Sequence, residues 1–143
     1  MDEVDRKILQ ALVRDARVPL KQLAEAAGLS GPATSDRLRR LEQRGILRGS
    51  TIDIDPAALG YGLEAVVRIR PMPGQLHLVQ QMIQDTPEVV ECDKITGDDC
   101  FVARLFVRSL NDIDGILDRI AERASTSTSL VKAKVISRRP PAF

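Results

Sequence analysis

The chain has 143 residues, of which 43% are hydrophobic and 29% charged, and its formal net charge is +1. This length allows one domain or two small ones, and the composition is typical of a soluble globular protein. No apolar run reaches the roughly 20 residues needed to cross a bilayer, and the start, MDEVDRKI, lacks the basic-then-apolar order of a secretory signal, so we expect a cytoplasmic protein with no membrane partner.

The charges are unevenly divided along the chain. Residues 1–50 contain 10 Lys and Arg against 7 Asp and Glu, whereas residues 51–143 contain 11 against 13. A mildly basic part beside a mildly acidic remainder fits a nucleic-acid-binding module joined to a second domain. Together with the helix and strand patterns described next, this places a first domain at residues 1–50, a linker at 51–61 and a second domain at 62–143.

The N-terminal third shows the spacing of three helices. Apolar side chains recur at helical intervals over residues 3–15. A second, short helix over 19–27 ends at Gly28, and Ser30 caps a third helix over 31–44. Two helices followed by a tight, glycine-containing turn and a further helix form the helix-turn-helix pattern.

The third helix and the segment after it carry the arginines that suggest DNA contact. Three of them are three and four residues apart and so share one face, and small side chains stand at the helix start, where a recognition helix meets base edges in the major groove. Residues 46–55 alternate weakly, which predicts a small two-stranded wing or a strand leading out of the domain. We predict DNA contacts for Ser30, Ala33, Thr34, Ser35, Arg37, Arg39, Arg40, Arg44 and Arg48.

From Leu63 onward the pattern alternates between strand and helix periods. It predicts strands at 63–70, 89–96, 100–107 and 130–137, and helices at 76–83 and 111–120. The turn TGDD joins the two middle strands. The order β-α-β-β-α-β is the ferredoxin-like arrangement, so the whole chain has an α+β fold class.

Cysteine and histidine are too few for a common metal site. The chain contains only Cys92, Cys100 and His77 of these residue types. A structural zinc site needs four ligands, usually in close pairs. We therefore expect free thiols, no metal and no cofactor.

The sequence resembles the Lrp/AsnC (leucine-responsive and asparagine-responsive) family of transcriptional regulators. The matching stretches are DEVDRKILQALVRDARVPLKQLAEAAGLS, LRRLEQRGIL and TGDDCFVARL, and together they span almost the whole chain. The resemblance implies a winged helix-turn-helix that binds double-stranded DNA, followed by a ferredoxin-like regulation-of-amino-acid-metabolism (RAM) domain. It also implies a homodimer formed by sheet faces, and further assembly, often to an octamer.

The resemblance further implies an amino acid or related metabolite as effector, bound between subunits of adjacent dimers. Many relatives have aspartate and tyrosine where this chain has Cys100 and Phe101, so the ligand ammonium would use Asp98 or Asp99 instead. Backbone N–H groups near a glycine and an exposed carboxylate suit a zwitterion, although a polar turn and a hydroxyl-rich cap would show the same residues. The implied ligand-binding residues are Thr96, Gly97, Asp98, Asp99, Ser125, Thr126, Ser127 and Thr128.

Three alternatives remain compatible with the sequence. Siroheme decarboxylases share the two-domain architecture, but their chemistry is expected to use histidines and this chain has only His77. With no Ser/His/Asp set, metal cluster or phosphate-binding glycine loop, we expect no enzyme activity. The protein could also be a ligand-sensing oligomer that does not bind DNA, or the arginines could be an ordinary solvated surface paired with Asp36 and Glu42.

Overall fold

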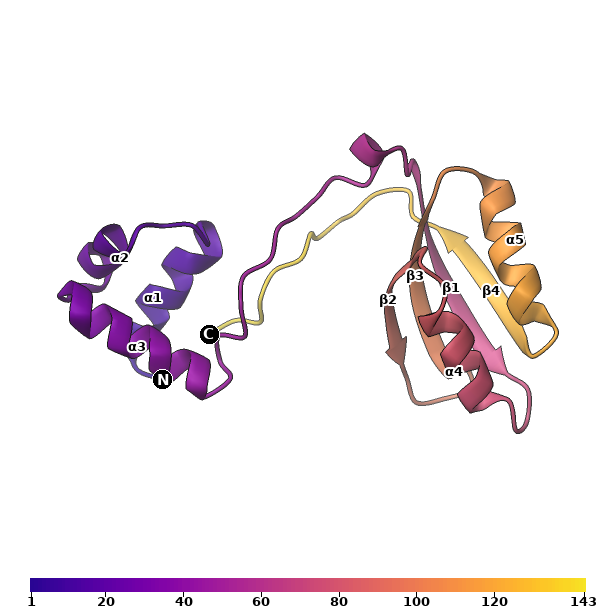
Figure 1. Cartoon of the computed structure of the whole chain (residues 1–143), viewed down its shortest axis with the longest axis horizontal. Helices are drawn as coiled ribbons and strands as arrows, with labels where there is room; N and C mark the ends of the chain where they lie inside the picture. Colours follow the sequence, from indigo (N-terminus) through magenta and orange to yellow (C-terminus); the bar gives the residue numbers. More distant parts are fainter. The chain divides into compact units, whose positions relative to one another are not determined.

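The computed structural model describes all 143 residues as two compact units, residues 1–53 with 136–143 and residues 54–135 (Figure 1). None of the helices combines the length and the apolar character that a membrane span requires. The elements are α1 (Glu3–Arg14), α2 (Leu20–Ala27), α3 (Gly31–Gln43), the 3₁₀ helix η1 (Ala57–Leu59), β1 (Leu63–Pro71), α4 (Leu76–Gln84), β2 (Val89–Lys94), β3 (Phe101–Val107), α5 (Leu110–Ala121) and β4 (Ala124–Leu130).

The three helices of the first unit enclose a small core to which each contributes. Ile8, Leu23 and Leu41 are 0%, 2% and 1% exposed and come from α1, α2 and α3 in turn. Gly28 ends α2 with φ of 70°, a left-handed conformation that glycine adopts without steric cost. Ser30 then caps α3, its Oγ accepting the backbone N–H of Ala33. The predicted helix-turn-helix core is therefore present.

The predicted wing is wrong for the isolated chain. Residues 44–56 contain no strand, and the backbone N–H groups of Ile46 and Leu47 both donate to the carbonyl oxygen of Leu41. These bonds close the C-terminal turn of α3 rather than starting a β-ribbon. Residues 48–55 make no backbone–backbone hydrogen bond within the chain, and Ile52 is 78% exposed. A short alternating pattern without a second strand to pair with does not form a sheet.

The second unit is a four-stranded antiparallel sheet in the order β2-β3-β1-β4, with α4 and α5 packed on one face (Figure 1). Burial alternates along β3, because every second side chain points into the core beneath the helices. The core includes Val67, Ile69 and Leu105 from the sheet, and Ile83 and Ile116 from the helices. The other face, which no helix of the unit covers, is called the open face below.

The last strand lies earlier than predicted. Residues 130–137 were expected to form it from their apolar character, but the strand is the hydroxyl-rich stretch Ala124–Leu130. The segment after it makes one sheet-like bond, from the N–H of Val131 to the carbonyl of Glu64, and Val135 is 95% exposed. Backbone pairing with β1 selects the strand here, and an edge strand tolerates polar side chains on both faces.

Candidate functional site

The outward side of α3 follows from its buried side. Thr34 and Leu41 are buried and Leu38 packs against the core, which fixes the inner direction of the helix. Since a helix turns by roughly 100° per residue, the opposite direction is set by other positions. These are Pro32, Asp36, Arg39 and Gln43, with Arg40 beside them, and all five are exposed.

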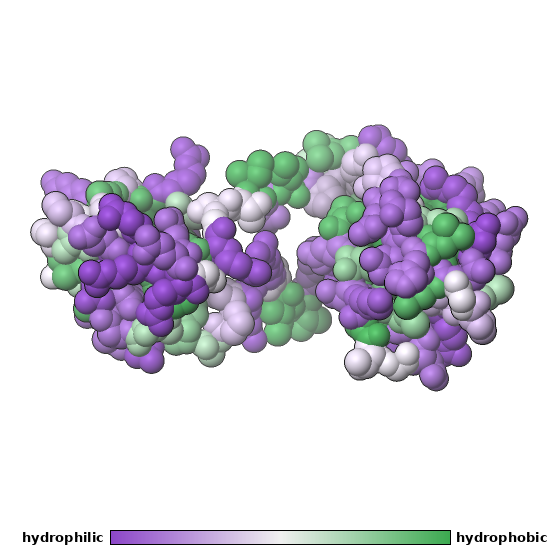
Figure 2. Space-filling model, turned by 60° about the horizontal axis from the view of Figure 1, so that its bottom comes forward, coloured by the Kyte–Doolittle hydropathy of each residue, from purple (hydrophilic) through white to green (hydrophobic).

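Four predicted arginines remain available on this unit. Arg39 forms an ion pair with Asp36 (Nη1 to Oδ1, 3.2 Å), but both side chains are more than half exposed, so the pair exchanges readily with another anion. The exposed side chains Arg40, Arg44 and Arg48 form no ion pair within the chain. Hydrophilic residues accordingly cover much of this unit in Figure 2, where it lies on the left.

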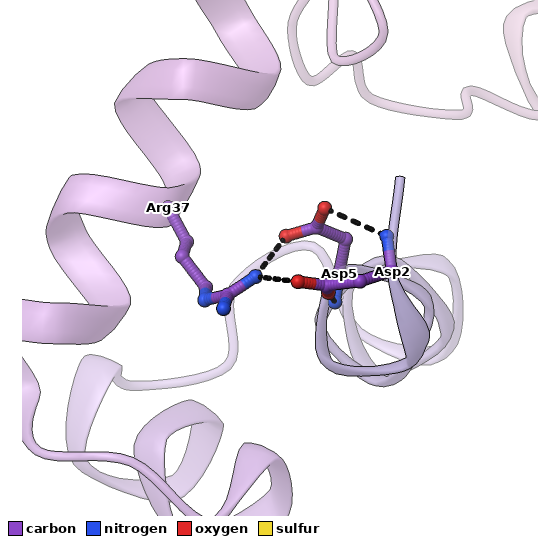
Figure 3. A network of polar contacts seen from close by, with 3 residues as sticks. All are labelled: Asp2, Asp5 and Arg37. Atoms are coloured by element: carbon purple, nitrogen blue, oxygen red, sulfur yellow. Dashed lines mark hydrogen bonds and ion pairs between the residues drawn. The ribbon is translucent and has the colours of Figure 1, made fainter.

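Arg37 behaves differently from the other arginines. Its Nη1 donates to Asp2 Oδ2 at 2.6 Å and to Asp5 Oδ1 at 2.8 Å, both at the start of α1 (Figure 3). The side chain of Arg37 is 28% exposed and that of Asp5 is 12% exposed. Hydrogen bonds to Asp2 and then Asp5 raise the pKa of Arg37 above its ordinary value. The predicted shared face of Arg37, Arg40 and Arg44 therefore turns toward α1.

A polar groove of about 400 Å³ separates the start of α1 from α3. The paired carboxylates lie on one of its sides, and the unpaired Arg40 of α3 and Arg44 at the α3 C-cap line it from the other. The groove shows that the acidic pair stands close to cations that have no partner. It is lined by Met1, Asp2, Asp5, Arg37, Arg40, Leu41, Gln43 and Arg44.

The small residues at the start of α3 divide into two groups. Ser30 is exposed, and Ala33 and Ser35 are half-buried. Thr34 is 0% exposed, and its hydroxyl donates to the carbonyl oxygen of Ser30 at 2.9 Å. The prediction that Thr34 reaches a base is therefore wrong in this structure, because its only polar side-chain atom is buried and bonded within the helix.

Sequence reasoning missed Gln43. Its amide offers a donor and an acceptor, the pattern that pairs with the major-groove edge of adenine. Its position seven residues after Asp36 and four after Arg39 on the outward side was readable from helical spacing.

In the second unit, the two aspartates of the TGDD turn form ion pairs with two arginines of β1. Arg70 Nη2 lies 3.4 Å from Asp99 Oδ1 and 3.7 Å from Asp98 Oδ2. Arg68 Nη1 lies 3.8 Å from Asp99 Oδ2. Gly97 has φ of 106°, which only glycine adopts readily in this turn. Sequence reasoning did not assign Arg68 and Arg70 to the site, although their alternation with the core residues of β1 places them on the open face.

The register of β4 separates the predicted hydroxyl residues into two sets. Ser125 and Ser127 pair with Arg70 and Arg68, so they share the open face with the arginines. Thr126 and Thr128 alternate with these serines and point to the opposite face. Arg70 thus lies between the turn and Ser125. Of the four predicted hydroxyl residues, only the two serines lie on the same sheet face as the arginines that contact Asp98 and Asp99.

The described residues include no group of three or more His, Cys, Asp and Glu side chains placed to hold a metal ion. Both cysteines are free, and burial raises the pKa of the Cys92 thiol, with Asp93 adding to the effect. The site is therefore one of charged and hydroxyl groups.

Comparison with known proteins identifies the family. Residues 1–42 match the AsnC-type helix-turn-helix domain and residues 64–141 match the Lrp/AsnC ligand binding domain. The chain belongs to the Lrp/AsnC family. The LrpA transcriptional regulator of Mycobacterium tuberculosis is 35% identical to this Lrp/AsnC protein over 129 residues, which cover 90% of the chain and 86% of the relative. The predicted family and the α+β fold class are confirmed.

Solved Lrp/AsnC structures show the same fold over nearly the whole chain. The structure of LrpC from Bacillus subtilis has a TM-score of 0.89 at 24% identity and covers 96% of this chain and 99% of its own. The feast or famine regulatory protein of M. tuberculosis, complexed with L-methionine, has a TM-score of 0.87 at 32% identity and covers 98% and 97%. Like LrpA, the curated relatives are named transcriptional regulators, and this chain is a helix-turn-helix regulator of that family.

Proposed function

We propose that this regulator binds double-stranded DNA by placing the outward side of α3 in the major groove. The observation that carries the proposal is the set of exposed arginines on the recognition helix of a helix-turn-helix. Arg39 and Gln43 face the base edges, where guanidinium and amide groups pair bidentately with guanine and adenine. Arg40, Arg44 and Arg48 contact phosphate, and Ser30, Ala33 and Ser35 lie at the helix start that enters the groove first.

Electrophoretic mobility shift with a fragment from upstream of the protein's own gene tests this proposal. The affinity should fall steeply with salt, with the slope of log affinity against log salt becoming more negative by about 0.9 per phosphate contact. The double variant Arg40→Gln with Arg44→Gln should flatten the slope, while Lys21→Gln, a charge change on α2, serves as the control. If no mobility shift occurs at low salt, the proposal of DNA binding is rejected, and the alternative of a ligand-sensing oligomer that does not bind DNA is favoured.

We also propose an amino-acid effector site at the end of β1. Arg70 and the N–H groups of the TGDD turn suit a carboxylate, and the side chain of Asp98, which is 89% exposed, suits an ammonium. Ser125 and Ser127 add hydroxyls on the same face. The relative complexed with L-methionine supports this class of ligand. Thermal-shift screening of the common amino acids should find a stabilising ligand, and Arg70→Gln should abolish that shift.

We propose that the open face forms a homodimer interface and that dimers assemble further, as an octamer. The face combines the half-buried side chains Val66, Val102 and Phe106 with ion pairs among Arg104, Glu64, Glu91 and Lys134. A face with both apolar and charged groups that no helix covers suits a self-complementary contact. Light scattering should give a multiple of the monomer mass, and Phe106→Asp should lower it.

A further inference from the structure

We propose that Asp2 and Asp5 hold Arg37 away from DNA and use it to position α3, so that Arg37 is a positioning residue and not a DNA contact. The inference rests on the proposed DNA binding. It assigns to the start of α1 a part in sequence selectivity, although that segment lies outside the recognition helix.

The first support is the geometry of the pair. Arg37 belongs to the middle of α3, whereas Asp2 and Asp5 are the N-cap and third residue of α1. Each carboxylate is itself fixed by the backbone: the N–H of Asp5 donates to Asp2 at 2.8 Å, and the N–H of Asp2 donates to Asp5 at 3.1 Å. The guanidinium therefore binds a preformed acidic capping box. This contact fixes the rotation of α3 about its own axis relative to the N-terminus of α1.

The second support is charge. Two carboxylates contact Nη1 of one guanidinium, so the cluster is net negative when all three groups are ionised. A DNA phosphate approaching Arg37 meets these carboxylates as well, and like charges at short range oppose each other. Arg40 and Arg44 line the same groove without ion-pair partners. Phosphate contact consequently falls to them, and the acidic pair limits non-specific attraction near the recognition helix.

The third support is direction. Arg37 lies near the inner boundary of α3, where its side chain is 28% exposed, whereas the side chain of Arg39 is 66% exposed. The rival arrangement is that the two carboxylates orient the remaining guanidinium nitrogens toward DNA. In the rival arrangement Arg37 neutralises one more phosphate than in ours. The slope of log affinity against log salt measures that number.

The experiment measures binding of the full chain to two duplexes of equal length and composition, one selected from a random library and one scrambled, over a range of salt. Arg37→Gln should keep the salt slope of the wild type and lower the preference for the selected duplex by about tenfold, comparable to the loss of one base contact. Arg40→Gln should flatten the slope by about 0.9.

A second variant releases the arginine instead of removing it. Asp2→Asn with Asp5→Asn keeps capping side chains, since asparagine caps helices well, but removes both charges from Arg37. Affinity for the scrambled duplex should rise and the slope should steepen by up to about 0.9 relative to a charge-matched control. The control, Glu3→Gln with Asp15→Asn, removes two charges from α1 and its C-cap without touching Arg37.

Each outcome decides a separate point. If the wild type binds neither duplex, DNA binding itself fails. If it binds and Arg37→Gln flattens the slope as Arg40→Gln does, Arg37 is a phosphate contact and the inference is overturned. Unchanged selectivity in Arg37→Gln, or a released variant that matches its control, overturns it too. Should Arg37→Gln fail to fold, Asp2→Asn with Asp5→Asn and Arg37→Gln removes the whole network without leaving an unpaired buried charge.

Discussion

Arg37 and Asp5 are 32 residues apart in the chain, yet Nη1 of the arginine lies 2.8 Å from Oδ1 of the aspartate. The contact joins the recognition helix to the first helix of the same unit. It therefore makes the start of α1 part of the apparatus that orients α3. We expect both the stability of the helix-turn-helix and its proposed DNA selectivity to depend on groups at this junction.

The turn between α2 and α3 should be sensitive to substitution at Gly28. Its φ of 70° strains any residue with a Cβ, although no atom lies within 4 Å of the position that a Cβ would occupy. Gly28→Ala should lower the free energy of unfolding by about 1 kcal/mol through the backbone alone. Gly28→Asn should cost less, because asparagine tolerates the left-handed conformation. Thermal unfolding followed by circular dichroism compares the two, and equal losses would contradict this account.

Thr34 should influence stability and not sequence preference. Thr34→Val keeps the shape of the buried side chain and removes the hydroxyl that donates to Ser30. The Ser30 carbonyl retains the backbone N–H of residue 34, so we expect a loss of about 1 kcal/mol and no orphaned group. Selection from a random duplex library should return the same site for the variant. Ser35→Ala, at the accessible start of the helix, is the comparison in which a changed preference is expected.

The local features of the first unit were predictable from the sequence. Asp2 and Ser30 act as caps and Gly28 as a left-handed helix end because these roles depend on neighbouring backbone only. The contact of Arg37 with α1 was not predictable, since helical spacing places side chains on a face but does not say which distant element covers that face. The predicted contact of Thr34 with DNA failed for a different reason: Thr34 lies four residues before Leu38 and seven before Leu41, so helical spacing already places it on the apolar inner side.

Strand pairing explains the other differences between the predicted and the observed elements. The run STSTS has no apolar alternation, yet it forms β4 because β1 offers it a continuous backbone partner. The stretch after Leu130 is more apolar, but beyond Val131, which bonds to Glu64, it makes no further backbone bond to β1. Likewise, residues 46–55 alternate without finding a second strand. Arg68 and Arg70, which we propose for the ligand site, could be placed beside the turn and the serines only from the strand register.

Acid should weaken the first unit through Asp2. The N–H of Asp5 and then the Arg37 guanidinium lower the pKa of the Asp2 carboxyl below its ordinary value of 3.8. A carboxyl whose pKa is lower in the folded state stabilises the fold above the unfolded pKa, and this contribution disappears as the pH falls through the folded value. Asp2→Asn should thus lose stability relative to the wild type at pH 6, and the difference should shrink as the pH falls below 3.8 toward the lowered pKa of Asp2. A difference that stays constant with pH would show that the charge of Asp2 has no part in it.

The register of β4 makes a distinction between adjacent hydroxyl residues. Ser127 pairs with Arg68 and lies on the open face, whereas Thr128 pairs with Val67 and points to the opposite face. If an amino acid binds beside Arg68 and Arg70, Ser127→Ala should weaken its binding by about fivefold, the loss expected for one hydrogen bond. Thr128→Ser, which keeps a hydroxyl on the other face, should leave the affinity unchanged. Isothermal titration with the amino acid that gives the largest thermal shift measures both. Equal weakening by the two variants would place the ligand elsewhere than on the open face, since only one of these side chains shares that face with the arginines.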